Sequence, residues 1–213
     1  MSLRIERKLL TRQTLMHAAL DLLDEGRSFA SLSLREVTRA AGIVPTAFYR
    51  HFESMDDLGL ALVESTSDTL RQLVRDARRQ LESGNMIIDA SVRKFLEHVA
   101  LNRREFGFVV RERFGGSATV RHAIGREIAV FARELSLDML KFPLFARMNA
   151  QDVDMITGFF VTSVANAAGD WLELLTEEEE ARREAYRVTL VHQLRLVMLG
   201  AISWNPRPKS QGS

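Results

Sequence analysis

Cysteine is absent from this chain of 213 residues. Disulfide bonds, thiolate nucleophiles and cysteine-ligated zinc sites are therefore excluded. No run of about 18 consecutive apolar residues occurs, which argues against a membrane-spanning helix. The first residues also lack the apolar core of a secretory signal peptide. These absences predict a cytoplasmic protein that does not act at a membrane.

Proline is scarce, with four residues in the whole chain, and the segments between the prolines have helical spacing. Apolar residues recur three and four positions apart, for example at Leu15, Ala18, Ala19, Leu22 and Leu23. No stretch alternates as a strand does, so the fold is expected to be all-α. We expect helices up to Gly26 and over residues 33–41, 45–51, 54–83, 86–101, 103–113, 118–140, 151–175 and 178–203.

The first 52 residues contain the start and stop signals of three helices. Ser33 and Glu36 have the spacing of a capping box, and Gly42 can adopt the positive φ that ends a helix. Pro45 suits the first turn of the next helix, where its missing N–H has no cost. The sequence therefore predicts a helix, a loop, a capped helix, a glycine turn and a short helix. This order is that of the tri-helical helix-turn-helix.

Charge is unevenly distributed along the chain. Residues 1–52 contain eight Lys or Arg and five acidic residues, so this part is +3 in a chain of net charge +1. A basic N-terminal part is typical of a protein that meets a polyanion. Arg12 is expected near the DNA backbone. The residues predicted to bind double-stranded DNA are Arg4, Arg7, Lys8, Ser33, Arg35, Val44, Pro45, Thr46, Tyr49, Arg50 and His51. Phe48 and Phe52 are expected to anchor the last helix inward.

The same region resembles the TetR family of bacterial transcriptional regulators. The resemblance is carried by Arg35-Glu36-Val37, Ala41-Gly42-Ile43, Phe48-Tyr49-Arg50-His51-Phe52 and Asp57-Leu58. Residues 27–37, 42–52, 110–117 and 126–128 are similar to a subgroup, the FabR- and DesT-like repressors of unsaturated fatty-acid synthesis. Many family members have a lysine where this chain has Met55, which puts one phosphate contact in doubt.

The resemblance implies a homodimeric repressor that binds a palindromic operator and responds to a long-chain acyl-CoA. The expected organisation is a helix-turn-helix domain over residues 1–52, a helical ligand-binding and dimerisation domain over 53–205, and a disordered tail over 206–213. A fatty chain needs an apolar tunnel, and a coenzyme A head needs cations. The candidate ligand-binding residues are Phe95, Leu96, Val99, Phe106, Val109, Arg111, Arg113, Phe114, Phe131, Phe159, Phe160 and Val164. An ordinary helical core is the alternative interpretation of the apolar members, and solvated loop arginines that of the charged ones.

The last two predicted helices have the character of a dimer interface. The first of these helices has several small residues, which allow close helix packing. The second is apolar around most of its circumference, which indicates that it is buried on two sides. The predicted dimerisation residues are Gly158, Ala165, Gly169, Tyr186, Leu190, Leu194, Val197 and Ala201.

Motifs of enzyme chemistry are missing from the sequence. No G-x-S-x-G, G-x-G-x-x-G or phosphate-loop pattern occurs, and no two histidines are four residues apart. We therefore expect no catalytic residues, no metal site and no cofactor. Two alternatives to the acyl-CoA-responsive repressor stay open: a multidrug- or antibiotic-sensing regulator, and a helical acyl-CoA carrier that does not bind DNA.

Overall fold

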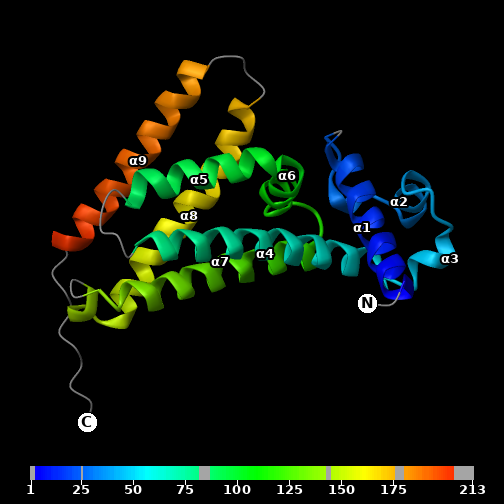
Figure 1. Ribbon diagram of the computed structural model, residues 1–213, viewed down its shortest axis with the longest axis horizontal. Helices are drawn as coiled ribbons and strands as arrows, with labels where there is room; N and C mark the ends of the chain where they lie inside the picture. The colour runs from blue at the N-terminus through cyan, green and yellow to red at the C-terminus, as the bar shows by residue number, and fades with distance from the viewer. Residues whose placement is uncertain (1–2, 25, 82–86, 143–144, 176–179, 204–213) are drawn as a thin grey trace, which may run out of the picture. The chain divides into compact units, whose positions relative to one another are not determined.

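The computed structural model of the chain describes residues 3–24, 26–81, 87–142, 145–175 and 180–203 (Figure 1). These residues contain α-helices, two 3-10 turns and no strand, so the all-α prediction is confirmed. The predicted tail over residues 206–213 lies outside the described residues. None of the helices in the described ranges combines the length and the apolarity that spanning a bilayer requires.

The described residues divide into two compact units. One contains the chain up to Val74 together with Asn102–Gly125, and the other contains Arg75–Leu101 and the chain from Arg126 onward. This division by packing differs from the predicted division at residue 52, because the first unit also includes much of α4 and a segment from the middle of the chain. The functional division at residue 52 stays a prediction.

The first unit is built on α1 (Leu3–Asp24), against which α2 (Leu34–Ala40) and α6 (Arg103–Glu112) pack. A 3-10 turn, η1 (Phe29–Ser31), lies between α1 and α2, and α3 (Pro45–Phe48) follows α2. The unit also contains the beginnings of α4 (Met55–Leu81) and of α7 (Ala118–Met139). Its core includes Leu15, Phe48 and Leu58, each fully buried.

The helix ends in this unit follow the predicted signals. Ser33 and Glu36 form both halves of the capping box, Gly26 and Gly42 have φ of +85° and +67°, and Ser54 accepts a hydrogen bond from the Asp57 amide. The predicted helix over 45–51 is too long, because α3 ends at Phe48 and the chain continues as turns.

The second unit packs α5 (Ile87–Leu101), α8 (Ala150–Leu174) and α9 (Glu180–Ser203) against one another. One buried cluster joins the three helices through Val92, Leu96, Ala167, Leu190, Val191 and Leu194. A second cluster joins the end of α7, the turn η2 (Phe145–Arg147), α8 and α9, with Val153 fully buried in it. The Arg187 guanidinium of α9 bonds the Asp89 carboxylate of α5 at 2.5 Å and holds the pKa of that carboxyl below its usual range.

Candidate nucleic-acid interface

Residues of α3 and on either side of it present an exposed surface. Val44, Pro45, Thr46, Tyr49 and Arg50 are all exposed, and the exposed fraction of Val44 and Tyr49 is 65%. These five residues were predicted from the sequence to contact DNA, and the structure brings them together at one place. An exposed valine and tyrosine beside an arginine can contact thymine methyl groups, base edges and phosphates.

The opposite side of this segment is fixed by aromatic packing. Phe48 and Phe52 are 0% and 1% exposed, and their ring centroids are 5.5 Å apart. The inward role predicted for these two residues is confirmed.

Arg12 of α1 adds a second anchor to the end of α3. Its Nη1 donates a hydrogen bond to the backbone oxygen of His51 at 2.7 Å, and its guanidinium carbon lies 4.2 Å from the centroid of the Phe52 ring. Its guanidinium fixes the chain that follows α3, since a cation over an aromatic face and a charge-assisted hydrogen bond both favour this position. The position of Arg12 beside the DNA backbone stays a prediction.

His51 lies half-buried among cations. Burial, followed by the charges of Lys8, Arg12 and Arg50, lowers the pKa of this imidazole below 6.5. Its Nδ1 is buried and has no hydrogen-bond partner among the described residues. Both effects favour the neutral imidazole, while the groups around it carry positive charge that suits an anion.

The remaining predicted DNA contacts lie on α1 and at the start of α2. Arg7, Lys8, Ser33 and Arg35 are exposed, whereas the side chain of Arg4 lies outside the described residues. The Ser33 hydroxyl is engaged in the cap of α2, where it donates to Glu36 Oε2 at 2.6 Å. A DNA contact by Ser33 would therefore share this hydroxyl with the capping box.

The predicted ligand-binding residues fall into two groups that belong to different units. In the second unit, Leu96 is part of the cluster that joins α5, α8 and α9, and Phe95, Phe160 and Val164 pack against it. Val99 of α5 is fully buried, Phe131 of α7 is half-buried and Phe159 of α8 is 61% exposed. The apolar residues that were proposed for an acyl chain here thus include core residues of the unit.

The first unit contains the other group, Phe106, Val109, Arg111, Arg113 and Phe114. Phe106 is buried, but Phe114 is 82% exposed, and the Arg113 guanidinium lies 5.5 Å from its ring centroid. The rings of Phe114 and Phe159 are both mostly open to water in this chain. The ligand-binding role of these residues stays a prediction.

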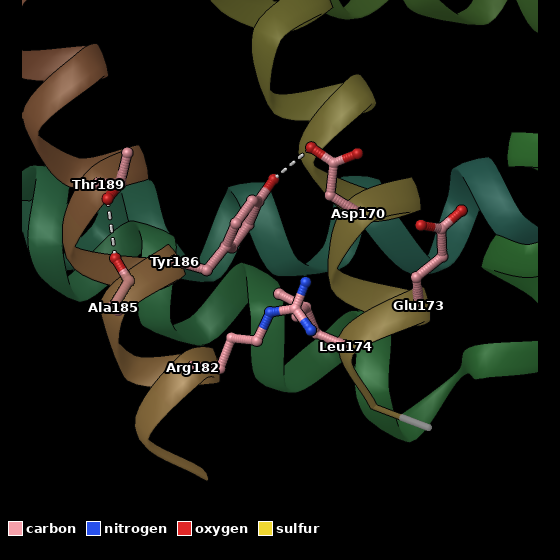
Figure 2. A pocket seen from close by; sticks show the side chains of 7 residues that line it. All are labelled: Asp170, Glu173, Leu174, Arg182, Ala185, Tyr186 and Thr189. Carbon is pink, nitrogen blue, oxygen red and sulfur yellow. Dashed lines mark hydrogen bonds between the residues drawn. The ribbon is translucent and has the colours of Figure 1, made fainter. Parts of the chain in front are cut away.

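A pocket of about 390 Å³, which was not predicted from the sequence, lies between α8 and α9 (Figure 2). Figure 2 shows the Tyr186 hydroxyl directed at Asp170, to which it donates a hydrogen bond of 2.9 Å. Burial and this carboxylate raise the pKa of Tyr186. The lining residues are Asp170, Glu173, Leu174, Arg182, Ala185, Tyr186 and Thr189. They share no sequence pattern, because they come from two helices that only tertiary packing brings together.

The dimerisation residues predicted on α9 need a correction. Leu190, Leu194 and Ala201 are 3%, 1% and 3% exposed within a single chain, because the clusters described above already bury them. Val197 is half-buried, as are Gly158, Ala165, Gly169 and Tyr186. The apolar side chains that these two helices leave exposed are different ones: Met155 and Phe159 on α8, and Val188, Leu196 and Leu199 on α9.

Two family models match the chain. The model described as "Bacterial regulatory proteins, tetR family" matches residues 15–62, and the model described as "Tetracyclin repressor-like, C-terminal domain" matches residues 85–197. The first match contains α2, α3 and the exposed surface around α3. The second contains α5 to α8 and most of α9, and it alone spans more than half of the chain.

Solved structures of regulators share this fold. A TetR-family transcriptional regulator from Syntrophomonas wolfei superposes with a TM-score of 0.71 at 16% identity, over 89% of this chain and 95% of that one. A gamma-butyrolactone receptor described as ArpA-like is 26% identical, with a TM-score of 0.56 over 89% and 98% of the two chains. The transcriptional regulator FadR from Bacillus subtilis, solved in complex with stearoyl-CoA, is 12% identical, with a TM-score of 0.63 over 90% and 97%.

Proposed function

Because the chain belongs to the TetR family of bacterial regulatory proteins, we propose that it represses genes of fatty-acid desaturation or unsaturated fatty-acid synthesis. In this proposal a homodimer binds a palindromic operator, and a long-chain acyl-CoA changes its affinity for that operator. The observation that carries the DNA-binding part is the exposed surface of Val44, Pro45, Thr46, Tyr49 and Arg50 above the buried Phe48 and Phe52.

In this proposal, the segment around α3 is held rigidly on its buried side and contacts DNA with its exposed side. The anchors hold the backbone around α3, so exposed side chains can meet a groove with little loss of conformational freedom. Thr46 and Tyr49 would contact base edges, and Arg50, Lys8 and Arg7 would contact phosphates or guanine.

The acyl-CoA effector is supported by two observations. The segments 27–37, 42–52 and 110–117 resemble the FabR- and DesT-like subgroup, and the similar FadR structure contains stearoyl-CoA. Phe95, Phe160 and Val164 of the second unit supply apolar surface that could re-pack around an acyl chain. A ligand of this kind acts by binding one conformation of the dimer more tightly than another.

A mobility-shift titration on palindromic DNA from beside a desaturase gene tests both parts of the proposal. The wild-type protein should shift the fragment, and Thr46→Ala or Tyr49→Phe should weaken binding about tenfold, which one lost polar base contact explains. Thr189→Ala is the matched control, because Thr189 is an exposed threonine on α9. Stearoyl-CoA or oleoyl-CoA, added to the same titration, should change the wild-type affinity.

The outcomes separate the alternatives. No shift at salt below about 50 mM, where phosphate contacts are strongest, contradicts the repressor and favours an acyl-CoA carrier. A shift that neither acyl thioester alters, from a protein in which mass spectrometry finds a different bound molecule, contradicts the acyl-CoA effector and favours a sensor of drug-like compounds.

A further inference from the structure

Glu112, the last residue of α6, is buried inside the first unit. Its exposed fraction is 2%, and its Oε1 accepts a hydrogen bond of 2.7 Å from the backbone N–H of Phe29. Its Oε2 is also buried and has no hydrogen-bond partner among the described residues. Removing a carboxylate from water is costly unless it is well bonded, so a residue that only fills space would not be a glutamate.

The chain around Glu112 is shaped to admit this carboxylate. A Cβ on Gly115 would lie 2.0 Å from Glu112 Oε2, so no side chain fits at position 115 while the carboxylate is in place. A Cβ on Gly116 would lie 2.9 Å from the Cβ of Ala30 in η1. The two glycines therefore let the turn between α6 and α7 approach both the carboxylate and the segment that precedes α2.

Further contacts tie the same turn to α4. Ser117 and Thr119 donate hydrogen bonds of 3.1 and 2.9 Å to the two carboxylate oxygens of Asp56 in the first turn of α4. The rings of Phe29 and Phe108 meet edge to face, with centroids 5.8 Å apart. The segment 112–119 thus holds both the entry to α2 and the start of α4, which flank the two helices of the candidate DNA reader.

We propose that Glu112 is a positioning residue for DNA binding: it fixes the α1–α2 segment through the Phe29 amide and thereby sets how α2 and α3 are presented. This inference rests on the proposed function. It gives the segment 110–117, whose arginines Arg111 and Arg113 are candidate contacts for coenzyme A, an additional structural role beside the candidate DNA-reading helices. Arg111 and Arg113 remain exposed and half-exposed at its surface, whereas Glu112 between them faces inward.

Three variants of the full-length protein separate hydrogen bonding from charge and from packing. Glu112→Gln keeps an oxygen that can accept from the Phe29 amide, Glu112→Asp keeps the charge but is one methylene too short, and Glu112→Met keeps only the length. Glu64→Met is the matched control, because Glu64 is exposed on α4 in the same unit.

The first measurement is amide hydrogen exchange of the free protein, which needs no DNA. Exchange over residues 26–52 should be about tenfold faster in the Asp and Met variants, as expected for the loss of one buried charge-assisted hydrogen bond. It should stay near the wild-type rate in Glu112→Gln and Glu64→Met, and α8 and α9 should be unchanged in all four. If residues 26–52 exchange at wild-type rates in every variant, Glu112 does not fix this segment and the proposal is overturned.

The second measurement is operator affinity in the mobility-shift titration. The Asp and Met variants should bind about tenfold more weakly, and Glu112→Gln should bind as the wild type does. If Glu112→Met does not fold, the comparison of Glu112→Gln with Glu112→Asp tests the proposal. If Glu112→Gln loses operator affinity and Glu112→Asp keeps it, the charge of Glu112 matters and its hydrogen bond to Phe29 does not. That result contradicts the proposal. A wild-type protein that binds no DNA refutes the proposed function instead, and the exchange rates then still decide whether Glu112 fixes residues 26–52.

Discussion

Gly59 illustrates how closely single residues control packing in the first unit. A Cβ at this position of α4 would lie 2.6 Å from the Val120 side chain and 2.8 Å from the Phe29 ring. Contacts this short require the neighbours to move, and Phe29 and Val120 are themselves buried. The absence of a side chain at Gly59 therefore allows α4, α7 and η1 to meet.

Replacing Gly59 by alanine should lower the free energy of unfolding by about 1–3 kcal/mol, the usual cost of overpacking a core. The control is Gly125→Ala in α7 of the same unit, where an added Cβ meets nothing within 4 Å. That change should stabilise the protein by about 0.5–1 kcal/mol, because alanine favours a helix over glycine. Chemical denaturation of the two variants measures both effects, and equal stabilities would contradict the packing found around Gly59.

Residue roles differ in how far the sequence could predict them. The outward direction of Tyr49 and the inward direction of Phe48 and Phe52 follow from helical spacing, and the structure agrees. The hydrogen bond from Arg12 to His51 and the burial of Glu112 against Phe29 could not be predicted, because these partners are 39 and 83 residues apart in the sequence. Arg12 was expected at the DNA backbone, and no local pattern distinguished Glu112.

At the level of helices, α2 depends on an ionised side chain. The Ser33 hydroxyl, the Ser33 amide and Arg27 lower the pKa of Glu36 from 4.5 to about 2. Because the pKa is lower in the folded protein, ionised Glu36 stabilises the fold above pH 4.5. That contribution is lost as the pH falls from 4.5 towards 2.

The difference in unfolding free energy between the wild type and Glu36→Gln should therefore be largest near neutral pH and should narrow as the pH falls through this range. Denaturation at a series of pH values measures it. Ser33→Ala should weaken the pH dependence, since the Ser33 hydroxyl is the largest cause of the lowered pKa. A difference that is the same at every pH would show that the charge of Glu36 has no part in the cap.

Helix boundaries were predictable where a local signal exists. The capping box, Gly26 and Gly42 act within a few residues, and each lies where the sequence placed it. The end of α3 was predicted three residues too late, since the spacing of Phe48 and Phe52 is helical although the chain there continues as turns. The rings of Phe48 and Phe52 point inward because they pack against each other, although the chain between them is not a regular helix.

For the whole molecule, dimerisation is a property of the second unit in our proposal. Val188, Leu196 and Leu199 follow one face of α9 and are 37%, 70% and 61% exposed. They would supply the apolar core of an interface that α8 extends with Met155 and Phe159. Leu190 and Leu194 support this surface from within, as members of the protomer's own core.

Leu199→Glu should therefore convert the dimer to monomer at micromolar concentration without unfolding it, because a charge buried without a partner at an interface is strongly unfavourable. Light scattering coupled to size-exclusion chromatography measures the mass. Leu101→Glu is the control, since Leu101 is 84% exposed at the end of α5 and outside this surface. A Leu199→Glu protein that stays dimeric would place the interface elsewhere.

The sequence by itself determined the helices, most of their ends and the exposed residues around α3, because these depend on spacing and on contacts within about one helical turn. Tertiary structure decided which apolar residues of α9 lie inside the protomer and which remain available to a second chain. It also decided that Glu112 bonds the segment before α2 and that residues of α8 and α9 line a pocket. Each of these depends on the approach of distant segments, which helical periodicity does not encode.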